Sequence, residues 1–219
     1  MNLLNRLGLK KVEYMVKFRN AKLADANQIA HIHIESSKIQ PGGFMHQLGY
    51  LFILNYYKIF IQEKHSLVIV AEDEYGLIYG FCSGTLDAEE HLSSLSKHRF
   101  LLFFSCLPAI IKSPNLLTEI INRKRHIQNN SDAIEFNNRS GVRNEYWGWR
   151  NNCDKSKSPE LFRTWMDIVF SYGYNSFKGE VDSANKNIVL FHKFLGAKIL
   201  KEIKLPDGRY RYFVEYSKK

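Results

Sequence analysis

Small hydroxyl and basic side chains stand directly before a predicted helix, at Lys155, Ser156, Lys157 and Ser158. Serine hydroxyls and the N–H groups of a helix N-terminus donate hydrogen bonds to phosphate oxygens, and the two lysines add positive charge. This spacing indicates a candidate phosphate site. A second interpretation stays open, in which the loop is an ordinary basic connection that Ser158 caps, with Pro159 in the first helical position.

Three titratable side chains in the last third of the chain are candidates for proton transfer. His192 lies in a predicted helix, and Glu145 and Glu180 lie on predicted strands. Histidine titrates near neutral pH and can donate a proton, while a carboxylate can act as a general base. The alternatives are a half-exposed histidine with no chemical role and two strand carboxylates that only contact solvent.

A metal site is not predicted. His31, His33 and Glu35 alternate, but residues two apart on a helix point in different directions and cannot converge on one ion. His33 or Glu35 lining an acceptor pocket stays open. The three cysteines are odd in number and form no C-x-x-C pair, so they indicate neither disulfides nor a thiolate site and favour a reducing cytoplasm.

The composition limits the class of partner. A formal charge of +9 favours anionic partners such as phosphorylated cofactors, nucleotide-linked substrates, nucleic acid or acidic lipid. Nucleic acid is not expected, because no recognised reading motif accompanies the basic clusters. Residues 1–15 carry basic side chains within their apolar stretch and do not resemble a secretory signal. The longest apolar run, residues 100–111, is too short to span a bilayer, so a soluble cytoplasmic protein is expected.

The first half of the sequence predicts a strand, two helices and a hairpin. A strand at residues 16–19 precedes a helix that Asp25 caps, and a second helix covers residues 44–62 after the breaker at residues 41–43. Two β-rich runs then meet through the turn at residues 73–76. The chain therefore opens as β-α-α-β-β.

The second half predicts an insert and then alternating elements. Residues 92–127 are helical in composition, with breaks at Pro108 and Pro114, and indicate an inserted helical hairpin before the polar loop at residues 128–141. The remaining segments are expected, in order, as a strand at 142–150, a helix at about 159–172, a strand at 176–181, a helix at 185–194 stopped by Gly196, and two strands at 198–204 and 210–216 around a turn at 206–208.

The segment Asn185-Lys186-Asn187-Ile188-Val189-Leu190-Phe191-His192-Lys193-Phe194-Leu195-Gly196-Ala197 is similar to the signature N-x-x-A-x-x-[FL]-Y-x-x-L-G-F of the GNAT N-acetyltransferase superfamily. A weaker likeness covers residues 18–36, which resemble the family's opening strand and first helix. The resemblance implies an α/β (α+β) GNAT fold, with a mixed sheet of about seven strands flanked by helices. It implies one domain over residues 16–219, with a helical insert at about 92–127, behind a basic extension at residues 1–15.

The family resemblance also implies an activity, the transfer of an acetyl group from acetyl-CoA, as co-substrate and without metal, to a primary amine of a small molecule. His192 stands where the family has a tyrosine acid beside the CoA sulfur, and Glu145 stands near a base of some relatives. Asn185 would contact the pantetheine arm, and the backbone of Tyr146 or Trp147 would polarise the thioester.

The pyrophosphate loop departs from the family pattern. Ser156 and Ser158 stand where the family has glycines, and a Cβ can block the close backbone approach that glycine permits. This departure keeps an alternative open, a degenerate GNAT domain that binds CoA or a partner without catalysis. The preferred acceptor is an amino sugar on a nucleotide or surface-polysaccharide precursor, which the positive charge suits.

The apolar run in the insert has four interpretations. Basic residues flank it on both sides, so a membrane-surface helix, a lid over the acceptor site and a homodimer interface all stay open. Extra core that covers the sheet is the fourth, because apolar helices usually bury themselves.

Overall fold

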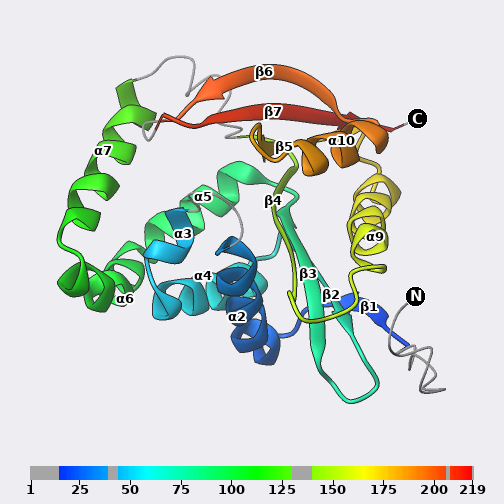
Figure 1. The fold of residues 1–219 in the computed structure, drawn as a ribbon, viewed down its shortest axis with the longest axis horizontal. Helices are drawn as coiled ribbons and strands as arrows, with labels where there is room; N and C mark the ends of the chain where they lie inside the picture. Colours follow the sequence, from blue (N-terminus) through cyan, green and yellow to red (C-terminus); the bar gives the residue numbers. More distant parts are fainter. Residues whose placement is uncertain (1–14, 39–43, 130–139, 206–207, 219) are drawn as a thin grey trace, which may run out of the picture.

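The computed structural model describes residues 15–38, 44–129, 140–205 and 208–218. In these ranges the chain forms a seven-stranded sheet with the order β1-β2-β3-β4-β5-β7-β6 and helices on both faces (Figure 1). Only β4 and β5 pair in parallel, and all other neighbouring strands are antiparallel. The expected mixed sheet of about seven strands flanked by helices is confirmed.

The strands are β1 (Lys17–Asn20), β2 (Ser66–Glu72), β3 (Ile78–Thr85), β4 (Arg143–Trp149), β5 (Ser176–Asp182), β6 (Lys198–Lys204) and β7 (Tyr210–Ser217). The helices of the described residues are η1 (Leu23–Asp25), α2 (Ala26–Ser37), α3 (Phe44–Gln47), α4 (Tyr50–Gln62), α5 (Ala88–Lys97), α6 (Arg99–Lys112), α7 (Asn115–Asn129), α9 (Ser158–Ser171) and α10 (Lys186–Phe194). The predicted N-terminal extension, apart from Met15, and the predicted breaker at residues 41–43 lie outside the described residues. So do most of the polar loop at 128–141 and most of the turn at 206–208.

Helices α2 and α4 cover one face of the sheet. Their aromatic and aliphatic side chains, among them Ile29, Tyr57 and Phe60, are fully buried against β2 and β3. The single helix predicted over residues 44–62 is wrong, because the chain forms α3 and α4 with a break at Gly49. Gly49 has φ of +89°, a left-handed conformation that a helix interior does not allow and that glycine adopts without steric cost.

Helix α9 covers the other face and anchors it with Trp165, whose indole N–H donates to the Leu67 carbonyl oxygen at 2.9 Å. The ring lies directly over Gly84 of β3. A Cβ at Gly84 would stand 2.1 Å from the Trp165 ring and 2.5 Å from the Arg143 carbonyl oxygen. Glycine at this position therefore lets α9, β3 and β4 approach one another closely.

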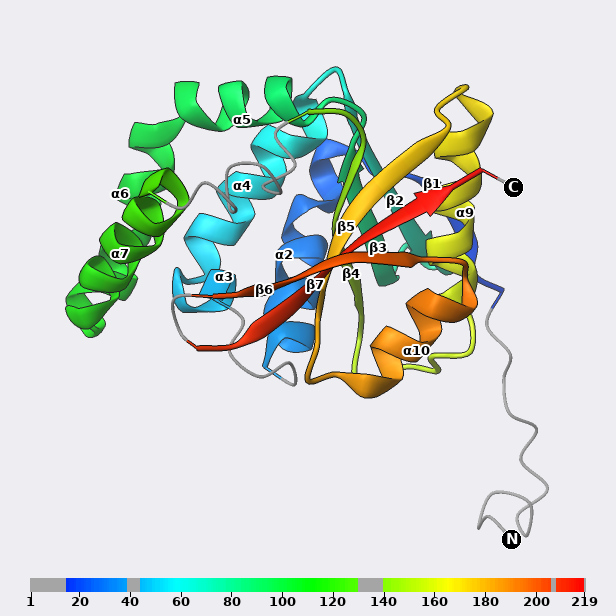
Figure 2. The ribbon, with the colours of Figure 1, turned by 90° about the horizontal axis from the view of Figure 1, so that it is seen from above.

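The insert consists of three helices rather than a hairpin. It begins earlier than predicted, at Ala88, because the Asp87 carboxylate accepts hydrogen bonds from the N–H groups of Glu89 and Glu90 and caps α5. Pro108 does not break the chain and lies inside α6, whereas Pro114 does separate α6 from α7. The three helices stand outside α4, on the side of the molecule away from α9 (Figure 2). No described helix is long and apolar enough to cross a membrane.

Asp25 occupies the position before α2 as expected, but neither it nor the alternative cap Ser158 caps a helix with its side chain. The Asp25 side chain does not cap α2, because it accepts from Arg19 and from the N–H of Lys22 at 2.6 Å. Ser158 is the first residue of α9 rather than its cap, and Lys157 precedes it without a side-chain cap. The predicted cap at Asn185 is confirmed, since its Oδ1 accepts from the N–H of Ile188 at 3.3 Å.

Candidate active site

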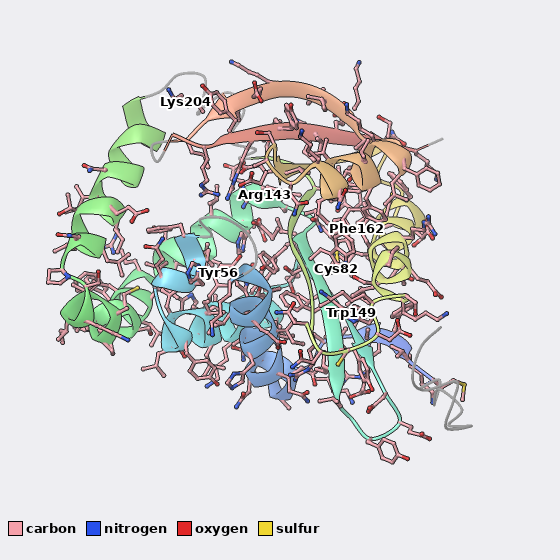
Figure 3. All side chains as sticks on the ribbon, viewed as in Figure 1. Tyr56, Cys82, Arg143, Trp149, Phe162 and Lys204 are labelled. Carbon is pink, nitrogen blue, oxygen red and sulfur yellow. The ribbon has the colours of Figure 1, made fainter. Side chains whose placement is uncertain are left out.

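Strands β4 and β5 begin together and then separate. They share a single paired position, Arg143 with Lys178, and no residue of β5 pairs with β4 beyond it. In Figure 3, Arg143 lies where the two strands meet and Trp149 lies toward the far end of β4. Because β3 pairs with the other edge of β4 along its length, the edge that faces the gap is open to a ligand.

A β-bulge in β4 sits beside this gap. Tyr146 pairs with Ser83 and Asn144 pairs with Gly84, so Glu145 is an extra residue without a partner on β3. The bulge changes which side chains face which layer. Glu145 and Tyr146 both contact residues of the layer that contains α2, α4 and α5, whereas Trp147 packs on Phe162 and Phe191 of the opposite layer.

The two separating strands enclose a cavity of about 130 Å³ together with α9 and α10. Liquid water occupies about 30 Å³ per molecule, so this space is large enough for several water molecules or for part of a small ligand. Its wall contains six of the predicted site residues, namely Glu145, Tyr146, Trp147, Glu180, Asn185 and His192. It also contains residues that the sequence analysis did not single out, among them Asn144, Phe162, Asp182 and Tyr216.

His192 is paired with a tyrosine from the last strand. Its Nδ1 forms a short hydrogen bond with the hydroxyl of Tyr216, and both side chains are buried. Burial lowers the pKa of His192 to about 4, because the imidazolium would lose its hydration. Burial likewise raises the pKa of Tyr216. At neutral pH both groups are therefore uncharged, and either can supply the hydrogen of the bond between them.

Each carboxylate of the cavity is paired with an arginine. Glu145 forms an ion pair with Arg143, and Glu180 accepts from Nη1 of Arg211 at 2.8 Å. Asp182 accepts from Nη1 of Arg209 at 2.9 Å, as the third such pair. Glu145 differs from the other two because it also faces a buried histidine, with its Oε1 at 3.9 Å from Nε2 of His91.

The side chains of Tyr146 and Trp147 hold β4 against the two helical layers. The Tyr146 hydroxyl bonds to those of Ser36 and Ser37 at 3.0 and 2.9 Å, and its ring stacks on His33. Trp147 stacks on Phe191, and its indole Nε1 is buried without a partner among the described residues. These contacts hold the backbone of β4 in place at the bulge. The N–H groups of this backbone are the donors that were predicted to polarise the thioester.

The predicted phosphate loop follows β4 and ends at Ser158, the first residue of α9, and none of its four residues lines the cavity. The Ser156 N–H already donates to Oδ1 of Asp154 at 3.0 Å, and the Ser158 N–H donates to the Lys155 carbonyl oxygen at 3.0 Å. The Lys157 ammonium pairs with Glu160 at 2.7 Å. The loop as folded therefore presents no preformed phosphate cradle of free N–H groups at these positions.

The remaining histidine, cysteine and carboxylate side chains do not form a metal centre in the part of the chain that the structure describes. Among the described residues, no group of three or more histidine, cysteine, aspartate or glutamate side chains is placed to hold a metal ion. His33 is buried, and burial, together with the charge of His46, lowers its pKa to about 3. Burial also raises the pKa of the Cys153 thiol, which favours the protonated, less reactive form.

Comparisons with known proteins identify the fold. No family model matches the sequence, and no curated protein matches it. The yncA protein of Salmonella typhimurium, solved with its cofactor acetyl-CoA, is 14% identical with a TM-score of 0.56, over 93% of this chain and 94% of that chain.

Two further solved structures agree. An N-acetyltransferase of Staphylococcus aureus Mu50 is 13% identical with a TM-score of 0.58, over 93% of this chain and 98% of that chain. A GNAT-family acetyltransferase of Bacillus cereus is 12% identical with a TM-score of 0.53, over 94% of this chain and 99% of that chain. The chain therefore has the fold of the GNAT acetyltransferases. At these identities the likeness shows the fold, while the activity has to be argued from the site.

Proposed function

We propose that this protein is an acetyl-CoA-dependent N-acetyltransferase that acts on a primary amine of a small molecule. The observation that carries the proposal is the gap between β4 and β5, which separate after one paired position and enclose the cavity beside the bulge at Glu145. An extended thioester arm with amide groups can bind along the open edge of β4 as an added strand would.

The wall of the cavity fits the thioester end of acetyl-CoA. The unpaired indole N–H of Trp147 is a buried donor that lacks an acceptor, and an unpaired buried donor costs free energy. An amide carbonyl oxygen of the arm could supply that acceptor after a small rotation of the ring. Asn185 also lines the cavity, and its amide N–H₂ group is a donor for a second carbonyl oxygen.

The phosphate end fits less well, because the amide of Ser156 is occupied by Asp154. We propose that Lys155 and the hydroxyls of Ser156 and Ser158 contact the pyrophosphate, with Lys157 adding charge, after the Asp154 contact opens. A Lys155→Ala variant is then expected to bind acetyl-CoA more weakly and acetyl-pantetheine, which has no pyrophosphate, as well as the wild type does.

The proposed chemistry uses the polar groups that line the cavity. Glu145 accepts the proton of the amine as its nitrogen bonds to the thioester carbon, and a backbone N–H of Tyr146 or Trp147 stabilises the negative charge on the carbonyl oxygen. The carbon–sulfur bond then breaks and its electron pair stays on the sulfur. His192, with its Nδ1 accepting from the Tyr216 hydroxyl, directs Nε2–H toward that sulfur and stabilises the thiolate, which takes its proton from water. Glu180, held by Arg211, is the second candidate base.

The proposed acceptor is an amino sugar that carries a phosphate or nucleotide. The net charge of +9 attracts such an anionic molecule and disfavours a polyamine. The carboxylates of the cavity do not reverse this preference, because Glu145, Glu180 and Asp182 are each neutralised by an arginine.

Calorimetry with acetyl-CoA, followed by release of free CoA thiol, tests the proposal. The amines are glucosamine 6-phosphate, a UDP-linked amino sugar, free lysine and spermidine. Binding with saturable thiol release on an amino sugar supports the full proposal. Binding without thiol release from any amine would instead support the degenerate, non-catalytic domain, and absence of binding would contradict both.

Two variants test the assigned roles. Glu145→Gln is expected to lower kcat by about 10²-fold or more, which is the typical contribution of one acid–base group. His192→Phe is expected to lower kcat by about 10²-fold as well, because the developing thiolate loses a hydrogen-bond donor. Glu202→Gln is the matched control, since Glu202 is an exposed carboxylate on β6 outside the cavity. Equal rates in all three variants would remove Glu145 and His192 from the mechanism.

We also propose that the insert contacts an acidic membrane surface. Phe100, Phe103, Phe104 and Ile111 follow helical spacing along one side of α6 and are 64%, 48%, 61% and 78% exposed. Arg99 at one end and Lys112 at the other flank this stripe, and such a helix lies in the headgroup region of anionic bilayers.

Co-sedimentation with vesicles tests this contact. Binding is expected with vesicles that contain phosphatidylglycerol, not with phosphatidylcholine alone, and is expected to be lost when Phe100 and Phe104 are both changed to serine. Tyr75→Ser is the control, because Tyr75 is an even more exposed aromatic residue, at the β2–β3 turn. A concentration-dependent dimer that the double variant abolishes, without vesicle binding, would show that the stripe is a homodimer interface instead.

A further inference from the structure

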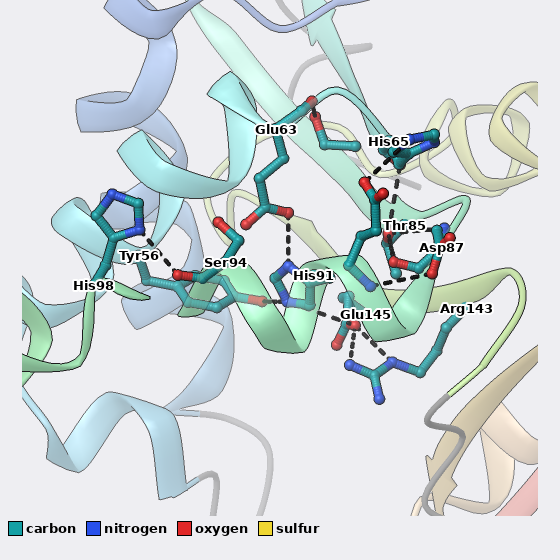
Figure 4. Close-up of polar contacts among 12 residues, drawn as sticks. Tyr56, Glu63, His65, Thr85, Asp87, His91, Ser94, His98, Arg143 and Glu145 are labelled. Carbon is teal, nitrogen blue, oxygen red and sulfur yellow. Dashed lines mark hydrogen bonds and ion pairs between the residues drawn. The ribbon is translucent and has the colours of Figure 1, made fainter. Parts of the chain in front are cut away.

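A buried histidine of the insert connects two carboxylates from different parts of the chain (Figure 4). Nδ1 of His91, on α5, lies 2.7 Å from Oε2 of Glu63, which follows α4. Its Nε2 lies 3.4 Å from the Tyr56 hydroxyl and 3.9 Å from Oε1 of Glu145 on β4. Glu145 is in turn paired with Arg143, so a continuous row of titratable groups reaches the wall of the cavity between β4 and β5.

The surroundings hold this imidazole in one place. The His91 side chain is 1% exposed, and the rings of Phe60 and Tyr56 pack on it at 4.5 and 6.0 Å. Glu63 is also nearly enclosed, and its Oε1 is buried without a hydrogen-bond partner among the described residues. A buried carboxylate oxygen that lacks a donor is costly when charged, so a proton that arrives at Glu63 relieves this cost.

The contacts of His91 determine its neutral tautomer. An ionised Glu63 can only accept, so Nδ1 carries the hydrogen and Nε2 presents its lone pair. This lone pair faces the Tyr56 hydroxyl from α4 and Glu145 from β4, with Arg143 beyond Glu145. Once Glu145 has taken up a proton, its carboxyl group therefore faces a hydrogen-bond acceptor, the Nε2 lone pair of His91, rather than another donor.

The row ends at a second opening in the surface. Glu63 and His91 line a separate cavity of about 290 Å³, together with Lys64, His65, Glu90, Ser93, Ser94 and Lys97. None of these residues lines the cavity between β4 and β5. The two openings are thus joined through His91, and only Glu145 belongs to the first of them.

We propose that His91 carries the proton of the acceptor amine from Glu145 to Glu63 and out to the second cavity. The proposal rests on the acetyl transfer proposed above. When the amine N–H bond breaks, its proton bonds to Glu145. The Glu145 carboxyl then moves about 1 Å to close its 3.9 Å separation from Nε2 of His91 and forms a hydrogen bond with it. It gives its proton to Nε2 while Nδ1–H passes to Glu63, and Glu63 releases a proton to water. The charge of each group is restored, so no other reactant is needed.

This route gives the insert a role in the reaction. Helix α5 is its first helix, and the Asp87 cap fixes the turn from which His91 projects. His91 acts through Glu145 rather than on the substrate, so it is a positioning residue, and its removal is expected to slow proton departure without weakening the binding of acetyl-CoA.

The pH and buffer dependence of the rate tests the route. His91→Asn retains a side-chain N–H for Glu63 but cannot carry a proton. We expect its kcat to be about 10-fold lower than that of the wild type in dilute buffer and to recover as imidazole buffer is added, with the KM for acetyl-CoA unchanged. Glu63→Gln should show the same recovery. His65→Asn is the matched control, since His65 lines the same cavity and pairs with Glu90 but does not contact Glu145.

The possible outcomes are distinguishable. A wild-type protein that cleaves no thioester contradicts the proposed function itself. If the wild type is active and both His91→Asn and Glu63→Gln have the same kcat as the wild type at every buffer concentration, the relay is overturned. Nitrogen NMR of the folded wild type provides a readout that needs no activity. We expect the hydrogen of His91 on Nδ1 at neutral pH, and a hydrogen on Nε2 instead would overturn the relay. If His91→Asn does not fold, Glu63→Gln and the NMR measurement still decide.

Discussion

The wall of the β4–β5 cavity contains a neutral histidine paired with a phenol, and a carboxylate paired with an arginine. His192 is kept uncharged by burial, whereas Glu145 is accompanied by Arg143 and His91. At one pH the carboxylate can therefore accept a proton while the neutral imidazole donates a hydrogen bond.

The depressed pKa of His192 makes the stability depend on pH. In the unfolded chain a histidine titrates near pH 6.5, but in the folded protein His192 takes up its proton only near pH 4. As the pH falls below 6.5, the unfolded state binds a proton at this histidine and the folded state does not. The free energy of unfolding therefore decreases by up to ~1.4 kcal/mol per pH unit. His33, with a pKa of about 3, adds to the same slope.

Urea denaturation at several pH values between 6.5 and 5 measures this slope. The His192→Gln variant is expected to reduce it relative to the wild type, whatever its effect on stability at pH 7.5. An unchanged slope would mean that His192 is accessible to protons in the folded state.

Gly84 is a second single residue on which the fold depends. Because a Cβ there would stand 2.1 Å from the Trp165 ring and 2.5 Å from a backbone oxygen, Gly84→Ala is expected to destabilise the protein by about 3 kcal/mol. Gly179→Ala on β5 is the control, since its nearest neighbour would be 3.8 Å away. Thermal unfolding of both variants tests this, and equal melting temperatures would contradict it.

At the scale of elements, the insert is attached to the site through the start of α5. The Asp87 carboxylate accepts from the N–H groups of Glu89 and Glu90 at 3.0 and 3.1 Å, and the Ala88 N–H donates to the Gly141 carbonyl oxygen just before β4. The first turn of α5 is therefore held both by its own cap and by the approach to β4, and it places His91 beside Glu145.

Removal of this cap should weaken both stability and transfer. Asp87→Ala is expected to cost about 1 kcal/mol, because two helix N–H groups lose their acceptor, and to lower kcat through the displaced His91. Asp87→Ser retains a capping oxygen and should recover most of both losses. Melting temperature and thiol release measure the two effects, and a loss of stability with full activity would separate α5 from the reaction.

At the scale of the whole molecule, the charge of +9 predicts how ligand affinity responds to salt. The attraction of a phosphorylated ligand to a basic surface is screened over a Debye length of about 10 Å at 0.1 M salt. The Kd for acetyl-CoA is expected to rise severalfold between 50 and 300 mM NaCl, as measured by calorimetry. Acetyl-pantetheine, which lacks the phosphates, should show almost no change, and an equal response of both ligands would contradict the electrostatic interpretation.

The sequence by itself determined the order of the elements and much of their extent. Asn185, Gly173 and Gly196 bound helices through caps and positive φ angles, and the Asp73–Gly76 turn joins β2 to β3. These signals involve neighbouring residues, so they can be read from a short segment. The likeness at residues 185–197 also gave the fold class. Local signals failed at Gly49, where a positive φ angle divides the predicted helix, and at Asp25, whose carboxylate accepts from Arg19 and Lys22 instead of capping α2. Helix α9 begins one residue earlier than predicted, at Ser158.

Only the tertiary structure decided how the site is assembled. Six residues of the cavity wall could be named from the sequence. The separation of β4 and β5 after one pair and the bulge at Glu145 could not, since strand register depends on packing across the sheet. The sequence also did not single out Tyr216 beside His192, or His91 between Glu63 and Glu145. Those partners come from elements far apart in the chain, and no local pattern encodes contacts that form only when the layers close over the sheet.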